Sequence, residues 1–343
     1  MYTPISYFSG QENLCISASG GNDIGYVVSG SDVWKYHSFS TPGSHTYTIH
    51  SGSAPHKLIV VGAGGTGGIS VGDTFDVGGG GGGGFVYLDN LPFTNGSYNL
   101  FVGSGSQNAV IAGGWVQPNN PNITYDSAVP INGQSSYIDY LYTPTSPDTG
   151  YYLTSSTITA FGGGGGSCVY SISSLYGYST GIKGQDGGSG GGGCTWGDGS
   201  GAKSVPAGSG SYNLNGLSPH GFNGGVVDPN NIQATAGGGA SSTGSVLYAG
   251  NGISILPYTG IEQTVSIGGK GKSSTGGTPT PNITSGSGGV GQFSYGTLSY
   301  TKGQNGFVTL MYKLCDDDLT NCTTYSINGG GSGGNVYYVP CGG

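Results

Sequence analysis

Short apolar runs that alternate with glycine blocks dominate the pattern of this chain. The run Leu58–Val61 leads directly into glycine, and Phe85–Leu88 follows directly on seven consecutive glycines. Both runs are too short for helices and contain β-branched or aromatic residues, so they predict buried strands. The segment His45–Ile49 alternates in polarity and places Tyr47 and Ile49 on one face of a strand. Similar apolar pieces lie at 98–102, 137–142, 153–161, 246–248 and 307–312.

The glycine blocks themselves, such as 78–84, fit neither helix nor ordinary strand. Each glycine costs a helix about 1 kcal/mol relative to alanine, and glycine offers a sheet no side chain to pack. Two alternatives remain, a flexible linker or extended polyproline-II-like segments that stack on one another. The composition favours order, because 76 glycines accompany 25 tyrosines and 34% hydrophobic residues, with only 7% charged.

We therefore predict an all-β fold: a β-sandwich-like framework with glycine-rich insertions that form polyproline-II-like (polyglycine) segments, and almost no α-helix. The predicted parts are an attachment or packing segment (1–35), a glycine-rich β domain (36–314) and a C-terminal tail containing cysteines (315–343). Within the domain, the run 307–312 is expected to pair with Leu58–Val61. The tail is expected to form a hairpin around a Gly-Asn loop.

Several functional classes are excluded by the sequence. Residues Gly62–Gly67 match the dinucleotide pattern G-x-G-x-x-G, but no helical period follows to hold a pyrophosphate. The net charge is −8 and all eight basic residues are lysine, which argues against nucleic-acid binding. No window of about 18 apolar residues predicts membrane insertion, and the N-terminus lacks the pattern of a Sec signal peptide.

The sequence also gives no support for catalysis, a cofactor or a metal. The two glutamates, Glu12 and Glu262, lie far apart and outside any motif, so we expect no enzyme. Four histidines cluster in the chain, but two of them, at 45 and 50, point to opposite faces of one strand. No carboxylate completes a ligand set, so we interpret the cluster as solvent-facing strand residues: His37, His45, His50 and His56.

The six cysteines form no C-x-x-C pair. Cys168 and Cys194 each end a glycine block, and a disulfide between them would tie two glycine segments together. The alternative is two reduced, buried thiols. The C-terminal cysteines, which lie at short spacings, are candidates for pairing among themselves or with Cys15: Cys315, Cys322 and Cys341.

Aromatic residues between the glycine blocks of 161–300 are the candidate binding residues. Tyrosine together with serine, glycine and asparagine is typical of adaptable binding loops. Sugars have apolar faces that pack on aromatic rings, so the candidates for receptor contact are Tyr176, Tyr178, Trp196 and Tyr212. The alternative is that these rings cap the ends of the glycine segments.

The stretch TYTIHSGSAPHKLIVVGAGGTGG, followed much later by GQNGFVTLMY, resembles the glycine-rich domains of phage tail-fibre and other virion surface proteins. The shared pattern is an apolar strand ending in G-A-G-G, long glycine blocks and a closing strand, and it covers roughly residues 36–312. The same layout resembles the glycine-rich region of some animal receptor tyrosine kinases. The tail, T-x-Y-S-I-N…G-x-V-Y-Y-x-x-C, resembles C-terminal pieces of surface and virion proteins from Bacteroidetes and their phages.

These resemblances imply a virion structural surface protein, such as a fibre, spike or capsid decoration, that contacts host-surface glycans. The expected location is the virion surface. A weakly charged, tyrosine-rich chain favours a homo-oligomer, with a trimer preferred, or docking on other virion structural proteins. The alternatives are a subunit of a secreted bacterial filament or adhesin, extracellular or on the cell surface, and an extracellular receptor fragment.

Overall fold

A computed structural model shows that the chain folds into strands and extended segments. The structure describes residues 16–29, 32–70, 76–106, 110–117, 120–129, 131–140, 157–172, 178–197, 202–205, 221–225, 234–246, 248–255, 263–272, 280–281, 283–293, 302–314, 322–326 and 336–340. None of these residues is helical. The predicted all-β class is therefore confirmed.

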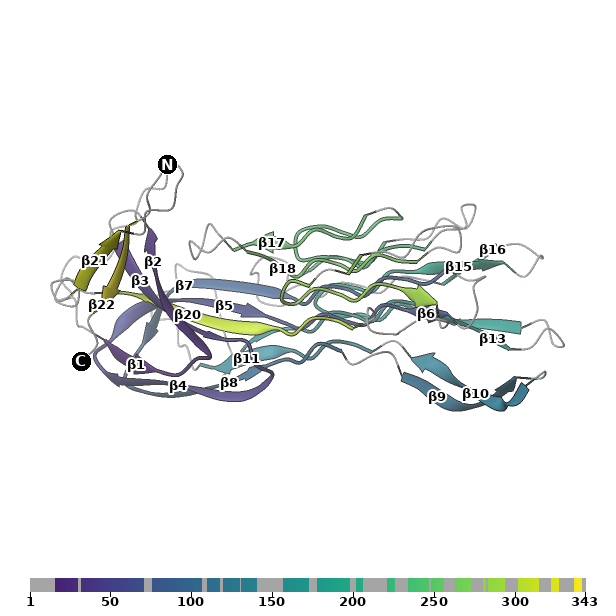
Figure 1. Ribbon diagram of the computed structural model, residues 1–343, viewed down its shortest axis with the longest axis horizontal. Coiled ribbons are helices and arrows are strands. Elements are labelled where there is room, and N and C mark those ends of the chain that lie inside the picture. Colours follow the sequence, from purple (N-terminus) through teal and green to yellow (C-terminus); the bar gives the residue numbers. More distant parts are fainter. Residues whose placement is uncertain are drawn as a thin grey trace, which may run out of the picture.

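Two five-stranded antiparallel sheets face each other at one end of the molecule, at the left of Figure 1. The first sheet contains, in spatial order, β1 (Ser17–Ser19), β4 (Gly43–Ser51), β8 (Gly96–Val102), β11 (Ser136–Asp139) and β12 (Thr157–Ala160). The second sheet contains β2 (Asp23–Ser29), β3 (Asp32–Phe39), β20 (Phe307–Lys313), β5 (Ala54–Val61) and β7 (Phe85–Phe93).

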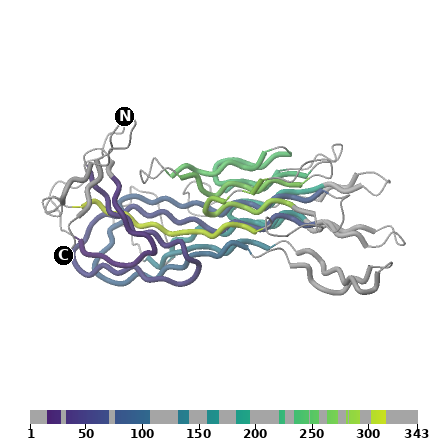
Figure 2. Tube along the Cα trace, viewed as in Figure 1, coloured from purple at the N-terminus to yellow at the C-terminus, as the bar shows by residue number. Residues whose placement is uncertain are grey.

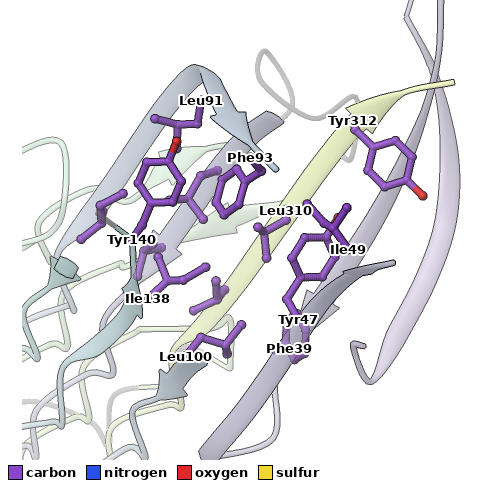
Figure 3. Close-up of a cluster of buried hydrophobic side chains, with 14 of the residues drawn as sticks. Phe39, Tyr47, Ile49, Leu91, Phe93, Leu100, Ile138, Tyr140, Leu310 and Tyr312 are labelled. Carbon is purple, nitrogen blue, oxygen red and sulfur yellow. The ribbon is translucent and has the colours of Figure 1, made fainter. Parts of the chain in front are cut away.

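The core between the two sheets consists of the inward-facing residues of both. In β4, Tyr47 and Ile49 are buried as the alternation predicts. The predicted pairing of β5 with β20 is confirmed, with Leu58 opposite Leu310 in the ladder. Figure 3 shows side chains from both sheets meeting in this cluster, among them Phe39, Phe93, Leu100, Ile138 and Tyr140.

The second sheet is buried on both faces at two of its strands, β5 and β20. Leu58 and Val60 face the first sheet, whereas Ile59 and Val61 face the opposite way. A second apolar cluster covers this outer face, contributed by Ala240, Ile255 and Val265 from later in the chain. Burial on both faces explains why the sequence of β5 reads as a continuous apolar run rather than an alternating one.

Glycine-rich segments run directly out of the sandwich strands and lie alongside one another, extending to the right in Figure 2. We refer to them together as the glycine bundle. The segments continuous with β5, β7, β8, β11, β12 and β20 are 62–68, 76–84, 103–106, 131–135, 161–167 and 302–306. Further segments of the bundle come from 183–193, 221–225, 234–246, 248–252, 263–272 and 283–291.

Short strands complete the structure. The mixed sheet comprises β14 (Tyr178–Ile182), β13 (Cys168–Ile172), β6 (Ile69–Ser70) and β19 (Gln292–Phe293). Antiparallel pairs are β9 (Val110–Gln117) with β10 (Asn120–Val129), β15 (Cys194–Gly197) with β16 (Ala202–Val205), and β17 (Ile253–Ser254) with β18 (Thr264–Val265). In the tail, β21 (Cys322–Ser326) pairs antiparallel with β22 (Val336–Pro340). In the apolar piece at 246–248, the described residues Val246 and Tyr248 are not in a strand, and Tyr248 is 71% exposed.

Candidate functional site

The segment 76–84 lies at the centre of the glycine bundle, and its backbone groups reach six neighbouring segments. Its N–H groups donate to three of these segments, and residues three apart in the block donate to the same segment. The acceptors are Ser167, Gly164 and Phe161 for Gly78, Gly81 and Gly84; Thr235 and Gly238 for Gly79 and Gly82; and Gly289 and Gly286 for Gly80 and Gly83. This period of three matches polyproline II, which has three residues per turn and no internal hydrogen bonds.

The carbonyl groups of the same segment accept hydrogen bonds from three further segments. The donors are Gly68, Gly65 and Gly62 for Gly78, Gly81 and Gly84; Gly192 and Ser189 for Gly79 and Gly82; and Gly269 for Gly80. All seven glycines of the block are buried. The central block therefore satisfies its buried N–H groups through neighbours on all sides rather than through one flat ladder.

Close backbone contact explains why this block is glycine. A Cβ atom built on Gly81 would overlap the carbonyl oxygen of Ser189, and one built on Gly83 would overlap that of Gly62. The segment Gly62–Gly67, which matches the dinucleotide pattern, lies in the same bundle. A Cβ atom built on Gly64 or Gly67 would overlap a neighbouring carbonyl oxygen in the same way. The glycine pattern thus serves backbone packing and forms no turn into a helix.

The bundle has a sandwich end and a distal end, the latter being the end away from the sandwich. Gly62, which follows β5, bonds to Gly84, which precedes β7; six residues further along, Gly68 bonds to Gly78. Three hairpins lie between segments at the distal end: β9/β10 between 106 and 131, β13/β14 between 167 and 183, and β15/β16 after 193. Figure 1 places these strands at the right.

Two of the four predicted receptor-binding residues belong to this distal end. Tyr178 begins β14, and Trp196 lies in β15 opposite Lys203 of β16. The strands β13 and β15 lie side by side, so the two hairpins are neighbours. Tyr176 and Tyr212 lie outside the described residues. The backbone therefore places Tyr178 and Trp196 on adjacent hairpins.

Three of the six cysteines lie in described strands, and the other three lie outside the described residues. Cys168 begins β13 and Cys194 begins β15, where the Cys194 side chain is buried. The residue before Cys168, Ser167, donates its N–H to Gly192 at 2.9 Å, so the two cysteines follow adjacent segments. Their pairing stays a prediction. Cys322 begins β21 opposite Pro340, and the remaining candidates lie outside the described residues: Cys15, Cys315 and Cys341.

The interpretation of the four histidines as solvent-facing is wrong for two of them. His50 is exposed and His45 partly so, but His37 and His56 are fully buried in the sandwich core. The signal was present in the sequence: His56 shares its strand parity with Leu58 and Val60, which face inward. The polar rings are tolerated because each finds a backbone carbonyl.

Hydrogen bonds fix the tautomer of His56. Its Nδ1 donates to the Ala54 carbonyl at 2.7 Å, so its Nε2 accepts from the Tyr47 hydroxyl at 2.9 Å. His37 donates from Nδ1 to the Gly20 carbonyl at 2.7 Å, and its buried Nε2 has no hydrogen-bond partner among the described residues. Tyr312 stacks on His37, with ring centroids 5.9 Å apart.

Burial controls the ionisation of this cluster. It lowers the pKa of His56 to about 4, with the Ala54 carbonyl opposing the shift and His37 adding to it. Burial likewise lowers the pKa of His37, against the effect of the Gly20 carbonyl. The pKa of Tyr47 is raised, mainly by burial. Both imidazoles are therefore neutral structural groups at pH 7.

The described residues hold no group of three or more histidine, cysteine or acidic residues that could bind a metal ion. Among them, no helix is long and apolar enough to cross a membrane.

Comparison with known proteins identifies the domain. No curated protein matches the chain. Residues 40–313, which extend from just before β4 to the end of β20, match the family described as a glycine-rich domain. The match spans the sandwich from β4 onward together with the whole glycine bundle, and by this match the chain belongs to the glycine-rich domain family.

Proposed function

We propose that this protein is a structural surface protein of a virion, a fibre, spike or capsid decoration that contacts host-surface glycans through the distal end of its glycine bundle. The observation that carries the proposal is the arrangement of the bundle. Its central segment is bonded to neighbours on six sides, and hairpins containing Tyr178 and Trp196 follow from its far end.

A stiff support favours binding because the loops that it carries lose less conformational freedom when they meet a ligand. Glycine segments held by backbone hydrogen bonds on all sides provide such a support without presenting side chains. Tyrosine and tryptophan provide large contact areas at a low entropic cost. The sandwich, at the opposite end, is then available for attachment to other virion proteins.

The proposal includes assembly as a homo-oligomer, with a trimer preferred. The chain has only 7% charged residues and 25 tyrosines, and Phe161 and Tyr248 are exposed, so we expect an isolated copy to present aromatic surface that partners would cover. Sedimentation of the purified protein measures this directly. A compact monomer that also fails to bind virion proteins would contradict the assembly.

Mass spectrometry of purified virions tests the location. We expect the protein in particles banded on a density gradient, and immunogold labelling at their surface. A protein absent from the particles but present in extracellular filaments would instead support the alternative, a subunit of a secreted bacterial filament or adhesin.

Two variants test the binding end. We expect Trp196→Ala, and the double variant Tyr176→Ala with Tyr178→Ala, to reduce adsorption to host cells without changing the melting temperature. Ser51→Ala, on an exposed position at the end of β4, is the control that leaves adsorption unchanged. Loss of stability, or full adsorption by both variants, would show that these residues are not the receptor site.

A further inference from the structure

A groove on the outer face of the first sheet lies at the opposite end of the molecule from the distal hairpins. It has a volume of about 320 Å³, at the lower end of the range for small-ligand sites. The lining residues come from three adjacent strands, β4, β8 and β11: Ser44, His45, Thr46, Asn99, Leu100, Tyr137 and Asp139.

The ladder registers order these side chains into two rows across the sheet. In one row, Ser44 pairs with Phe101, which pairs with Tyr137. The Phe101 and Tyr137 rings stack, with centroids 5.6 Å apart and planes 15° from parallel. In the next row, Thr46 pairs with Asn99, and the same register sets Asn99 beside Asp139. The rows are two residues apart, which is about 7 Å along a strand.

Four polar side chains of the groove, taken from both rows, are available to a ligand. Within the described residues, the side chains of Ser44, Thr46, Asn99 and Asp139 make no hydrogen bond, and apart from the half-buried Tyr137 ring these are the exposed groups of the groove. His45 is occupied, because its Nε2 lies 2.6 Å from the Thr41 carbonyl. The backbone of β8 is paired on both sides, so an added strand could not dock here and recognition must use side chains.

We propose that this groove binds an uncharged pyranose. An aromatic ring beside a row of amide, carboxylate and hydroxyl groups matches the apolar face and the hydroxyls of a sugar ring. Charge selects the class of sugar: Asp139 lies in the groove and the chain carries a net charge of −8, so sialic or uronic acids are repelled. The proposal does not depend on the receptor contact at the distal end.

Saturation-transfer NMR on the full chain tests the groove. The probes are glucose, galactose, mannose and N-acetylglucosamine, with sialic acid and glucuronate as charged comparisons. We expect saturation transfer to at least one neutral sugar and to neither acid. No signal from any neutral sugar, or an equal signal from the acids, would overturn the proposal.

Variants then locate the site. Asn99→Ala and Tyr137→Ala should each weaken binding about five- to tenfold, the loss expected for one hydrogen bond or ring contact. Ser97→Ala is the matched control: it lies on the same face of β8, two residues from Asn99 and outside the groove. Asn99 is exposed, so its variant keeps the melting temperature even if Tyr137→Ala does not.

Trp196→Ala separates this site from the proposed receptor contact. We expect it to leave sugar binding in the groove unchanged. If Trp196→Ala abolished sugar binding while Asn99→Ala retained it, the sugar site would lie at the distal end, and the groove proposal would be overturned while the proposed function was supported.

Discussion

Two buried imidazoles give the sandwich core a built-in sensitivity to acid. In the neutral form, Nε2 of His56 accepts the Tyr47 hydroxyl hydrogen. Protonation removes this acceptor, so the Tyr47 hydroxyl hydrogen loses its partner, and it places a charge among Phe93, Tyr47 and Tyr312. His37 faces the same problem, because its Nε2 is buried without a partner among the described residues. Both rings can take up a proton without this energetic cost only when the protein unfolds and water solvates them.

The sign of the pH dependence follows from the lowered pKa values. The unfolded chain binds protons at these histidines near pH 6.5, whereas folded His56 does so only near pH 4. Stability is therefore complete above about pH 6.5 and falls as the pH decreases toward 4. For His56 alone, we expect a loss of about 2 kcal/mol between pH 7.5 and 5, measured by urea unfolding.

His37→Phe is the variant that tests this origin. It keeps a ring beside Tyr312 and removes one titrating group, so the loss of stability between pH 7.5 and 5 should become smaller. Equal unfolding free energies of the wild type at both pH values would contradict the assignment.

At the scale of the element, the glycine block 78–84 behaves as one unit, because each of its residues faces a different neighbour from the residue before. A methyl group on any residue from Gly78 to Gly83 meets a carbonyl oxygen of an adjacent segment. At some positions of the bundle, a serine or threonine hydroxyl replaces a backbone partner. The Thr235 hydroxyl, for example, accepts from the Gly193 N–H at 2.7 Å and lies 2.7 Å from the Gly225 carbonyl.

Gly81→Ala is expected to destabilise the protein by at least about 3 kcal/mol, the upper range for overpacking, because the segments cannot separate without losing several hydrogen bonds. Gly96→Ala is the matched control. Gly96 has φ of +148° but nothing within 4 Å of an added Cβ, so this variant reports backbone strain alone, about 1–2 kcal/mol. Equal thermal shifts for the two variants would show that backbone packing does not require glycine at position 81.

The sequence predicted the elements better than their partners. Alternation in β4 and the apolar run of β5 identified buried strands because side-chain burial leaves a period in the sequence. The same parity would have placed His56 in the core, but its polarity suggested solvent instead. Which segments surround 78–84 could not be predicted, since glycine carries no side chain whose size or polarity could specify a neighbour. The groove on the first sheet was missed because its residues come from three strands that only the register brings together.

At the scale of the whole molecule, the sandwich and the glycine bundle are two parts of one structure. Six sandwich strands continue directly into bundle segments. The outer face of the second sheet is covered by Ala240, Ile255 and Val265, which come from or border the bundle. Neither part can open without exposing apolar surface or unpaired backbone groups of the other, so we expect the two to unfold together.

Hydrogen exchange measures this coupling. Peptides covering 78–84 should exchange as slowly as those covering β5, because every N–H in the block is buried and donates to a neighbouring segment. Exchange of both then requires global unfolding. The half-buried Ser104, whose N–H bonds within the described residues only to the Gln134 side chain, at 3.2 Å, is the internal reference for faster exchange. Exchange of 78–84 at the rate of Ser104, with β5 still protected, would mean that the bundle opens independently and cannot act as a stiff support for the distal hairpins.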